Sequence, residues 1–182
     1  MAEGRRVGGV NLSKAEHVML VAQANLSLIG MSYAEVEARQ VLLDSLADAT
    51  NDLGDALASL GGAYEQLDDE QADRLEEQLF RSVQRAYGRA QRTYAEFASR
   101  YGLSGREFAM PSPGVPSTGV KGFVQGAVGA VERADLKLVA LQESSIAIEV
   151  GDVDLRAGLA EVRRLIDGVS QDAHAFLRSF GR

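Results

Sequence analysis

The chain has 182 residues, and its 19 lysines and arginines against 26 aspartates and glutamates give a formal net charge of −7. The absence of cysteine excludes disulfide scaffolds, thiolate metal sites and cysteine nucleophiles. The acidic balance argues against nucleic-acid binding, because a negatively charged body repels phosphates. An aromatic content of 6% also leaves few side chains for base stacking.

The sequence holds no apolar run of about 18 residues, so we expect no transmembrane segment. A partly apolar stretch at residues 17–31 follows Arg5 and Arg6, an order typical of export signals. Gln23 and Asn25 interrupt this stretch, and no small-residue cleavage site follows it clearly. We therefore expect a cytoplasmic protein.

Apolar residues recur at spacings of three and four along the chain, which predicts helices and leaves no period-two stretch for a strand. The first predicted helix covers residues 13–60. Within it, the capping pattern Ser32-x-x-Glu35 after Gly30 favours a kink or a break near residues 30–32. The glycine pair at residues 61–62 is expected to end the helix.

The second predicted helix covers residues 69–101. Asp68-x-x-Gln71 supplies an N-terminal cap, and Gly102 stands where a helix-ending glycine belongs. Acidic residues fill its first turns and arginines its later ones, an order that suits the helix dipole. The helix also carries aromatic residues every seven positions, with a second apolar row three positions after the first three of them, a seam typical of packed helices. These residues are Phe80, Tyr87, Tyr94 and Tyr101, with Val83, Ala90 and Phe97.

Residues 103–117 are predicted to form a linker that contains all three prolines of the chain. Its apolar residues Phe108, Met110 and Val115 indicate that it lies against the body of the protein. At about 3.1 Å per residue the linker reaches roughly 40 Å, so both a short connection and a crossover remain open.

Two further helices are predicted at residues 118–150 and 152–180, each with an unbroken sevenfold apolar series. Gly151 and Asp152 form a short joint between them, which requires the two helices to run antiparallel.

Each predicted helix has one apolar stripe, and four such stripes can close around a common core. We therefore predict an all-α fold, an elongated antiparallel four-helix bundle in a single domain, residues 1–182. Two long hairpins, residues 13–102 and 118–180, are joined by the linker at 103–117. An up-down-up-down order is the simplest arrangement.

Two charge stripes with the same spacing of 4, 4 and 3 residues are the first candidate for function. The acidic stripe consists of Asp44, Asp48, Asp52 and Asp55. The basic stripe consists of Arg81, Arg85, Arg89 and Arg92, extended by Arg74 and Arg100. Each stripe is expected to lie opposite its own apolar stripe and thus to face outward. Two interpretations remain open: a surface that binds an acidic partner or a second copy, or two solvated helix faces.

Four glycines in the third predicted helix are the second candidate. Gly119, Gly122, Gly126 and Gly129 lie roughly opposite the apolar stripe, where glycine costs about 0.5–1 kcal/mol relative to alanine. They indicate either a groove in which a further helix or a ligand docks, or a frayed start of the helix.

Catalytic and metal sites have little support in the sequence. His17 and His174 are its two histidines, and neither has a glutamate three positions before it, as a ferritin-like di-metal site requires. The bundle brings the start of the first helix and the end of the fourth to one end, so the two histidines could meet. Acidic residues are expected on outer faces, and phosphate-loop, nucleophile-elbow and dinucleotide motifs are absent. We predict no catalytic residue, metal or cofactor.

The sequence therefore establishes architecture better than function. Our hypothesis is a non-enzymatic structural or adaptor protein that acts through charged outer helix faces, binds a protein partner and self-associates as a homo-oligomeric scaffold. One alternative is an amphipathic protein that coats a membrane or granule surface when its hairpins open at the linker. A second alternative is a bundle that binds a metal or a small ligand.

Overall fold

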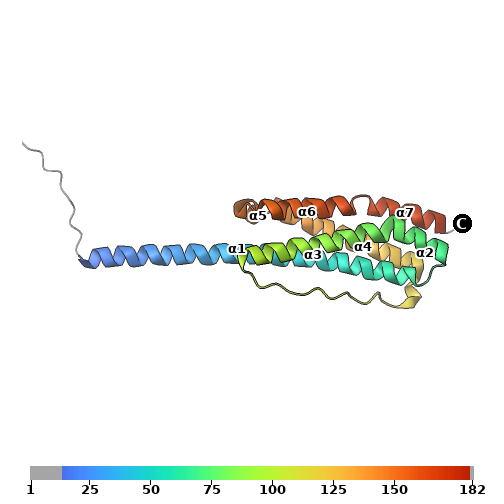
Figure 1. The fold of residues 1–182 in the computed structure, drawn as a ribbon, viewed down its shortest axis with the longest axis horizontal. Coiled ribbons are helices and arrows are strands. Elements are labelled where there is room, and N and C mark those ends of the chain that lie inside the picture. Colours follow the sequence, from blue (N-terminus) through green and yellow to red (C-terminus); the bar gives the residue numbers. More distant parts are fainter. Residues whose placement is uncertain (1–13, 181–182) are drawn as a thin grey trace, which may run out of the picture. The chain divides into compact units, whose positions relative to one another are not determined.

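The structure is a computed structural model that describes the backbone of residues 14–180 and the side chains of residues 33–180. All regular elements in residues 14–180 are helical and none is a strand, which confirms the predicted all-α fold. The chain divides into two compact units, residues 1–37 and 38–182. The first unit contains the beginning of helix α1, and the second contains every other helix (Figure 1).

Helix α1 (Lys14–Tyr64) is longer than predicted and is one continuous helix. The predicted break near residues 30–32 is wrong, because no interruption of the helix occurs there. The helix also continues through Gly61 and Gly62. A Cβ atom on Gly62 would lie 2.8 Å from Cε1 of Phe123, so this glycine makes room for an aromatic ring instead of ending the helix.

Helices α2 (Asp69–Leu75), η1 (Glu76–Phe80) and α3 (Arg81–Tyr101) follow one another without a break and replace the second predicted helix. The Asp68 side chain accepts a hydrogen bond of 2.9 Å from the Gln71 amide, and Gly102 ends α3 with a φ of 62°. The sequence did not predict the π-helical turn η1. Leu75, Leu79 and the next apolar residue are spaced by four, which is more than one turn of an α-helix. The wider turn of η1 compensates for this difference and keeps these residues on one face.

The linker after α3 runs back along the helices to the far end of the second unit, as Figure 1 shows. It is held near its start, where the Arg106 amide donates a hydrogen bond of 3.0 Å to the Tyr94 hydroxyl. It is held again near its end, where the Gln66 side chain donates a hydrogen bond of 2.8 Å to the Pro116 carbonyl. Helix η2 (Pro116–Thr118) then leads into α4.

The linker packs on the helices through Leu103 and Phe108, two of its four large apolar residues. Phe108 is half-buried and meets the Tyr94 ring edge-on, with 5.0 Å between the centroids. Met110 and Val115 are 57% and 63% exposed, so the expectation that they lie against the body is wrong. The aromatic contact, the ion pair between Arg106 and Asp48 and the hydrogen bonds at both ends hold the linker along the helices.

The two predicted C-terminal helices are each divided. Helix α4 (Gly119–Glu143) ends at Ser144, which caps α5 (Ser145–Val150). Helix α6 (Val153–Ile166) is separated from α7 (Val169–Phe180) by Asp167 and by Gly168, whose φ is 85°. The apolar series continues across both breaks, so periodicity alone does not reveal them.

Contacts between the helices fix their directions within the second unit. Gly62 lies beside Phe123 and Asp52 beside Arg133, so α4 runs antiparallel to α1. Helix α6 runs antiparallel to α3, since Asp152 contacts Arg100 near one end of the pair and Glu161 contacts an arginine of the preceding turns. Helix α4 therefore starts where α1 ends, and residues 103–115 form a crossover connection. Because α3 also runs antiparallel to α1, the order is up-down-down-up, and the expected up-down-up-down order is wrong.

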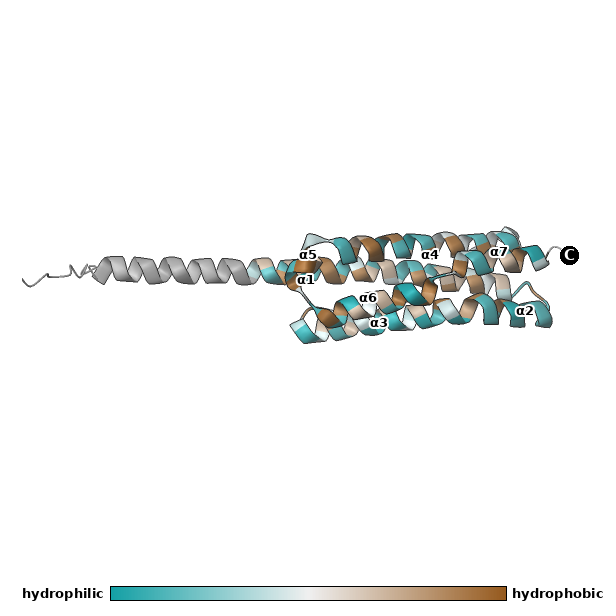
Figure 2. Cartoon of the chain, turned by 90° about the horizontal axis from the view of Figure 1, so that it is seen from above, coloured by the Kyte–Doolittle hydropathy of each residue, from teal (hydrophilic) through white to brown (hydrophobic). Residues whose placement is uncertain are grey.

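A continuous apolar core joins α1, α3, α4, α6 and α7. Figure 2 shows hydrophobic residues along each of these helices in the second unit. The largest fully buried side chains are Phe97, Phe176, Leu42, Leu43, Leu46, Leu53, Leu60, Leu75, Leu79, Leu138, Leu155 and Leu159. Four polar residues are buried among the described side chains, namely Thr50, Asp52, Thr93 and Asp152. Two of these are carboxylates, which corrects the expectation that acidic residues lie on outer faces.

Candidate functional site

The acidic stripe of α1 meets cations of the same chain. Asp52 was expected to face outward, but its side chain is 9% exposed and lies 3.1 Å from Nε of Arg133 and 2.5 Å from Nζ of Lys137. Asp48 contacts Arg106 of the linker at 3.5 Å, and Asp55 lies 3.9 Å from Arg133. The stripe is thus an internal connection between α1, α4 and the linker.

The remaining member of the acidic stripe, Asp44, is exposed and accepts a hydrogen bond of 2.9 Å from the Gln40 side chain. Three of the four carboxylates face the surface, as expected, and the buried one does not. The acidic and basic stripes have the same spacing, but the described side chains of the two stripes do not pair with each other. The acidic stripe pairs with residues of α4 and the linker instead.

The basic stripe of α3 has acidic partners at only some of its arginines. Arg89 lies 2.7 Å from Glu161 of α6, and Arg81 lies 3.1 Å from Glu76. Arg74 pairs with Glu70 one turn earlier in α2. The Arg81 and Arg74 pairs join residues within two turns of the same helical segment, and each exposed pair of this kind contributes about 1 kcal/mol or less.

Arg85 and Arg92 are exposed and form no ion pair with any residue whose side chain the structure describes. With Gly88 and Arg89 they line a shallow hollow of about 300 Å³, which Glu161 and Leu165 of α6 complete. A Cβ atom on Gly88 would have no atom within 4 Å, so the centre of the hollow is open. This part of the predicted stripe is a basic surface that can take an acidic group.

The predicted glycine groove on α4 has no occupant among the described residues. A Cβ atom on Gly126 would lie 3.6 Å from the Ser59 hydroxyl of α1, and one on Gly129 would lie 3.8 Å from the end of Arg133. A Cβ atom on Gly122 would lie 2.8 Å from Thr118 at the start of the same helical segment. Gly119 begins α4 with a φ of 68°, which favours glycine there. The docking of a further helix on this face stays a prediction.

The histidines and metal ligands add little to the candidate site. His174 is exposed, and its Nδ1 lies 2.6 Å from the Ser170 carbonyl oxygen. The His17 side chain lies outside the described residues. Among the described side chains, no group of three or more histidines, aspartates or glutamates could hold a metal ion.

A charged cluster that sequence reasoning missed joins the end of α3, the start of α6 and the interior of α1. Asp152, the N-cap of α6, accepts hydrogen bonds of 3.0 Å and 3.2 Å from Arg100 and one of 2.9 Å from the Tyr101 hydroxyl. Arg39 of α1 lies over the Tyr101 ring, with 4.4 Å from its guanidinium carbon to the centroid. The sequence identified Asp152 as a cap, but no local pattern links it to residues about fifty positions earlier.

The pKa values in this cluster follow from its contacts. Burial alone raises the pKa of Asp152, but the Leu155 amide, the Tyr101 hydroxyl and Arg100 stabilise its charged form more strongly, so the pKa lies below 3.8. Burial and the neighbouring Asp152 raise the pKa of Tyr101 above 10.0. At neutral pH the cluster therefore consists of a carboxylate, guanidinium groups and a neutral phenol, an arrangement that stabilises structure.

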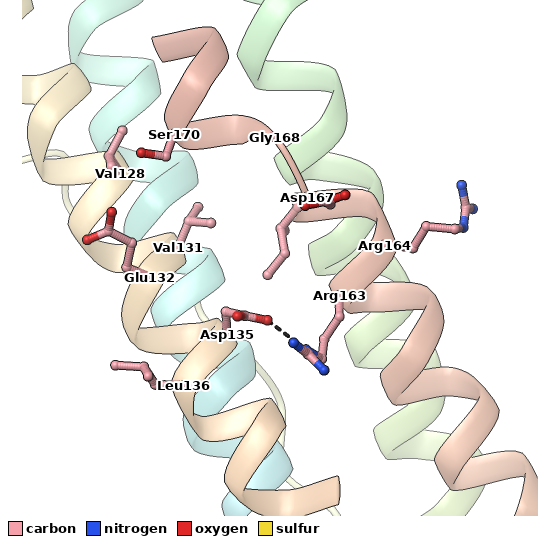
Figure 3. A pocket seen from close by; sticks show the side chains of 11 residues that line it. Val128, Val131, Glu132, Asp135, Leu136, Arg163, Arg164, Asp167, Gly168 and Ser170 are labelled. Atoms are coloured by element: carbon pink, nitrogen blue, oxygen red, sulfur yellow. Dashed lines mark hydrogen bonds and ion pairs between the residues drawn. The ribbon is translucent and has the colours of Figure 1, made fainter. Parts of the chain in front are cut away.

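A larger open groove of about 700 Å³ lies between α4 and the α6–α7 junction (Figure 3). Asp135 and Arg163 point toward each other across it, with 2.7 Å between Oδ1 and Nε. Its walls combine apolar residues such as Val131 with carboxylates such as Glu132 and Asp167. Because both acidic and basic groups line it, the groove has no single charge that would identify a ligand.

In comparisons with protein-family models, curated proteins and solved structures, nothing matches this chain. Across the described residues, no helix combines the length and the apolar character needed to cross a bilayer.

Proposed function

We propose that this chain is a non-enzymatic interaction protein whose basic surface on α3, formed by Arg85, Arg92 and the open hollow at Gly88, binds an acidic surface of a protein partner. We further propose that residues 38–180 act as a rigid four-helix bundle of two hairpins that presents this surface.

The observation that carries the proposal is the unequal pairing of the two charge stripes. The acidic stripe is largely satisfied within the chain, by Arg133, Lys137 and Arg106. Arg85 and Arg92 have no acidic partner among the described side chains, and both lie at a hollow without a side chain at its centre. Opposite charges on facing surfaces increase the rate and the specificity of association more than its strength, as an adaptor requires.

Affinity capture from a native lysate tests this function, with the full chain and the charge-reversed variant Arg85→Glu/Arg92→Glu as baits. We expect partners that bind the unchanged chain and are lost with the variant, because glutamates at these positions repel an acidic surface. Arg156→Glu/Arg178→Glu is the matched control, since both arginines are exposed on other helices and form no described ion pair. The same partners on all three baits would refute the proposal.

A further inference from the structure

The rod formed by α2, η1 and α3 has two halves of opposite charge. Within the rod, residues 69–77 contain five acidic residues and one arginine, whereas residues 78–100 contain five arginines and one glutamate. Figure 2 shows α2 and α3 along one edge of the second unit, with hydrophilic residues at many positions of both. The outer side of this rod is thus acidic at its beginning and basic over the rest of its length.

The charged residues of this rod lie on one outer strip. Glu70, Glu77, Arg81, Arg85 and Arg92 follow one another on the side opposite the buried residues Leu75, Leu79 and Val83. Asp73 and Glu77 are exposed and, like Arg85 and Arg92, form no ion pair with a described side chain. Each half of the strip therefore keeps charges that the chain itself does not neutralise.

We propose that this strip is a self-complementary interface through which two copies of the chain pair antiparallel about a twofold axis near Arg81. The inference rests on the proposed function and names a second copy as the acidic partner. In an antiparallel pair the acidic half of each rod lies beside the basic half of the other, whereas a parallel pair would bring like charges together.

The spacing along the rod supports this register. Glu77 and Arg85 are both four residues from Arg81, so each lies opposite the other in the pair, and Glu70 and Arg92 are both eleven residues away. Glu70 is seven residues from Glu77, and Arg85 is seven residues from Arg92, which is about 10 Å at 1.5 Å per residue. The contact between Glu77 and Arg85 and the contact between Glu70 and Arg92 therefore form together.

The arginines near the centre of the strip have acidic partners in their own chain. Arg74, which lies opposite Gly88 in this register, pairs with Glu70. The two copies of Arg81 meet at the axis, where Glu76, 3.1 Å from its own Arg81, offsets their repulsion. The interface is made of exposed ion pairs, so we expect a salt-sensitive dimer.

Light scattering of the purified full chain tests the inference through a charge exchange. At low ionic strength we expect the mass of two chains, and at about 1 M salt, where the Debye length is about 3 Å, the mass of one. The variants Arg85→Glu/Arg92→Glu and Glu70→Lys/Glu77→Lys should each be monomeric at low ionic strength. An equimolar mixture of the two should regain the dimer mass, because one set of Glu77–Arg85 and Glu70–Arg92 pairs keeps its charges and the other set is restored with its signs reversed.

The controls separate this inference from the proposed function. Arg156→Glu/Arg178→Glu should dimerise like the unchanged chain, and circular dichroism should show the helical content of every variant. If a charge-reversed variant fails to fold, Arg85→Gln/Arg92→Gln replaces it, with the same loss of the dimer expected. A monomer at low ionic strength, or a dimer that survives in both variants, overturns the inference. A monomer that still captures partners through Arg85 and Arg92 leaves the proposed function standing.

Discussion

Asp152 shows how one side chain can combine a cap, an ion pair and a buried hydrogen bond. Its carboxylate accepts the Leu155 amide at 2.6 Å, so it begins α6 while also contacting two residues of α3. The side chain is 4% exposed, so water cannot replace these partners. The cluster fixes the start of α6 against the end of α3.

Replacement of Asp152 by alanine should lower the free energy of unfolding by about 2–4 kcal/mol at neutral pH. The lost N-cap accounts for about 1 kcal/mol, and the lost hydrogen bonds from a charged group for about 1.5–3 kcal/mol. Urea unfolding followed by circular dichroism measures this change. The matched control is Asp154→Ala, because Asp154 is 74% exposed and contacts only Arg100 among the described side chains. Equal losses in both variants would contradict the role of Asp152.

The lowered pKa of Asp152 sets the pH range of this contribution. Since the folded pKa lies below 3.8, the stabilisation is complete above that value and is lost as the pH falls through the folded pKa. Asp152→Asn retains a cap acceptor but no charge. Its stability deficit relative to the unchanged chain should therefore shrink in acid below about pH 4.

At the scale of the helices, α3 and α6 are in close contact at Gly158. A Cβ atom on Gly158 would lie 2.5 Å from Cγ2 of Thr93, and both residues are buried. The Thr93 hydroxyl donates to the Arg89 carbonyl at 2.9 Å, which satisfies it within its own helix. The absence of a side chain at Gly158 therefore sets the separation of the two helices.

Gly158→Ala should destabilise the protein by about 1–3 kcal/mol, because the added methyl group overpacks the crossing. The sign of the change in stability distinguishes overpacking from helix propensity, because propensity alone favours alanine over glycine by about 0.5–1 kcal/mol. Gly129→Ala in α4 is the control and should be neutral or stabilising, since its nearest atom is the movable end of Arg133. The double variant Gly158→Ala/Thr93→Ala should regain part of the loss. Thermal unfolding measures all three, and a stabilised Gly158→Ala protein would show that the crossing is not tight.

Sequence periodicity predicted the helical stretches and their caps but not the interruptions within them. Asp68 and Gly102 act at the predicted ends because capping is local chemistry. Gly62 and Asp52 were misread, since their roles depend on Phe123, Arg133 and Lys137, more than sixty positions away. The candidate site likewise combines local and distant features. The exposed arginines were predicted from their spacing, whereas their lack of acidic partners is visible only in the tertiary contacts.

For the whole molecule, the direction of α4 follows from the path of the linker. Its length allows either a short turn or a crossover, so sequence alone left the choice open. Phe108 on Tyr94 and the hydrogen bond from Gln66 to Pro116 place its two ends at opposite ends of the second unit. Helix α4 then lies beside α1, and its cations meet Asp52.

A cut in the linker should leave the protein assembled, because contacts between the helices and not the connection hold the two halves together. We expect that a protease site introduced at the exposed residues Ser112 and Pro113 yields two fragments that co-elute in gel filtration in native buffer. The reason is that α4 packs on α1, and α6 on α3, so the core joins both fragments. Unfolding of the cut protein should depend on its concentration, unlike that of the uncut variant, since two chains must now reassociate. Fragments that separate in native buffer would show that each hairpin buries its apolar residues independently, contrary to the continuous core.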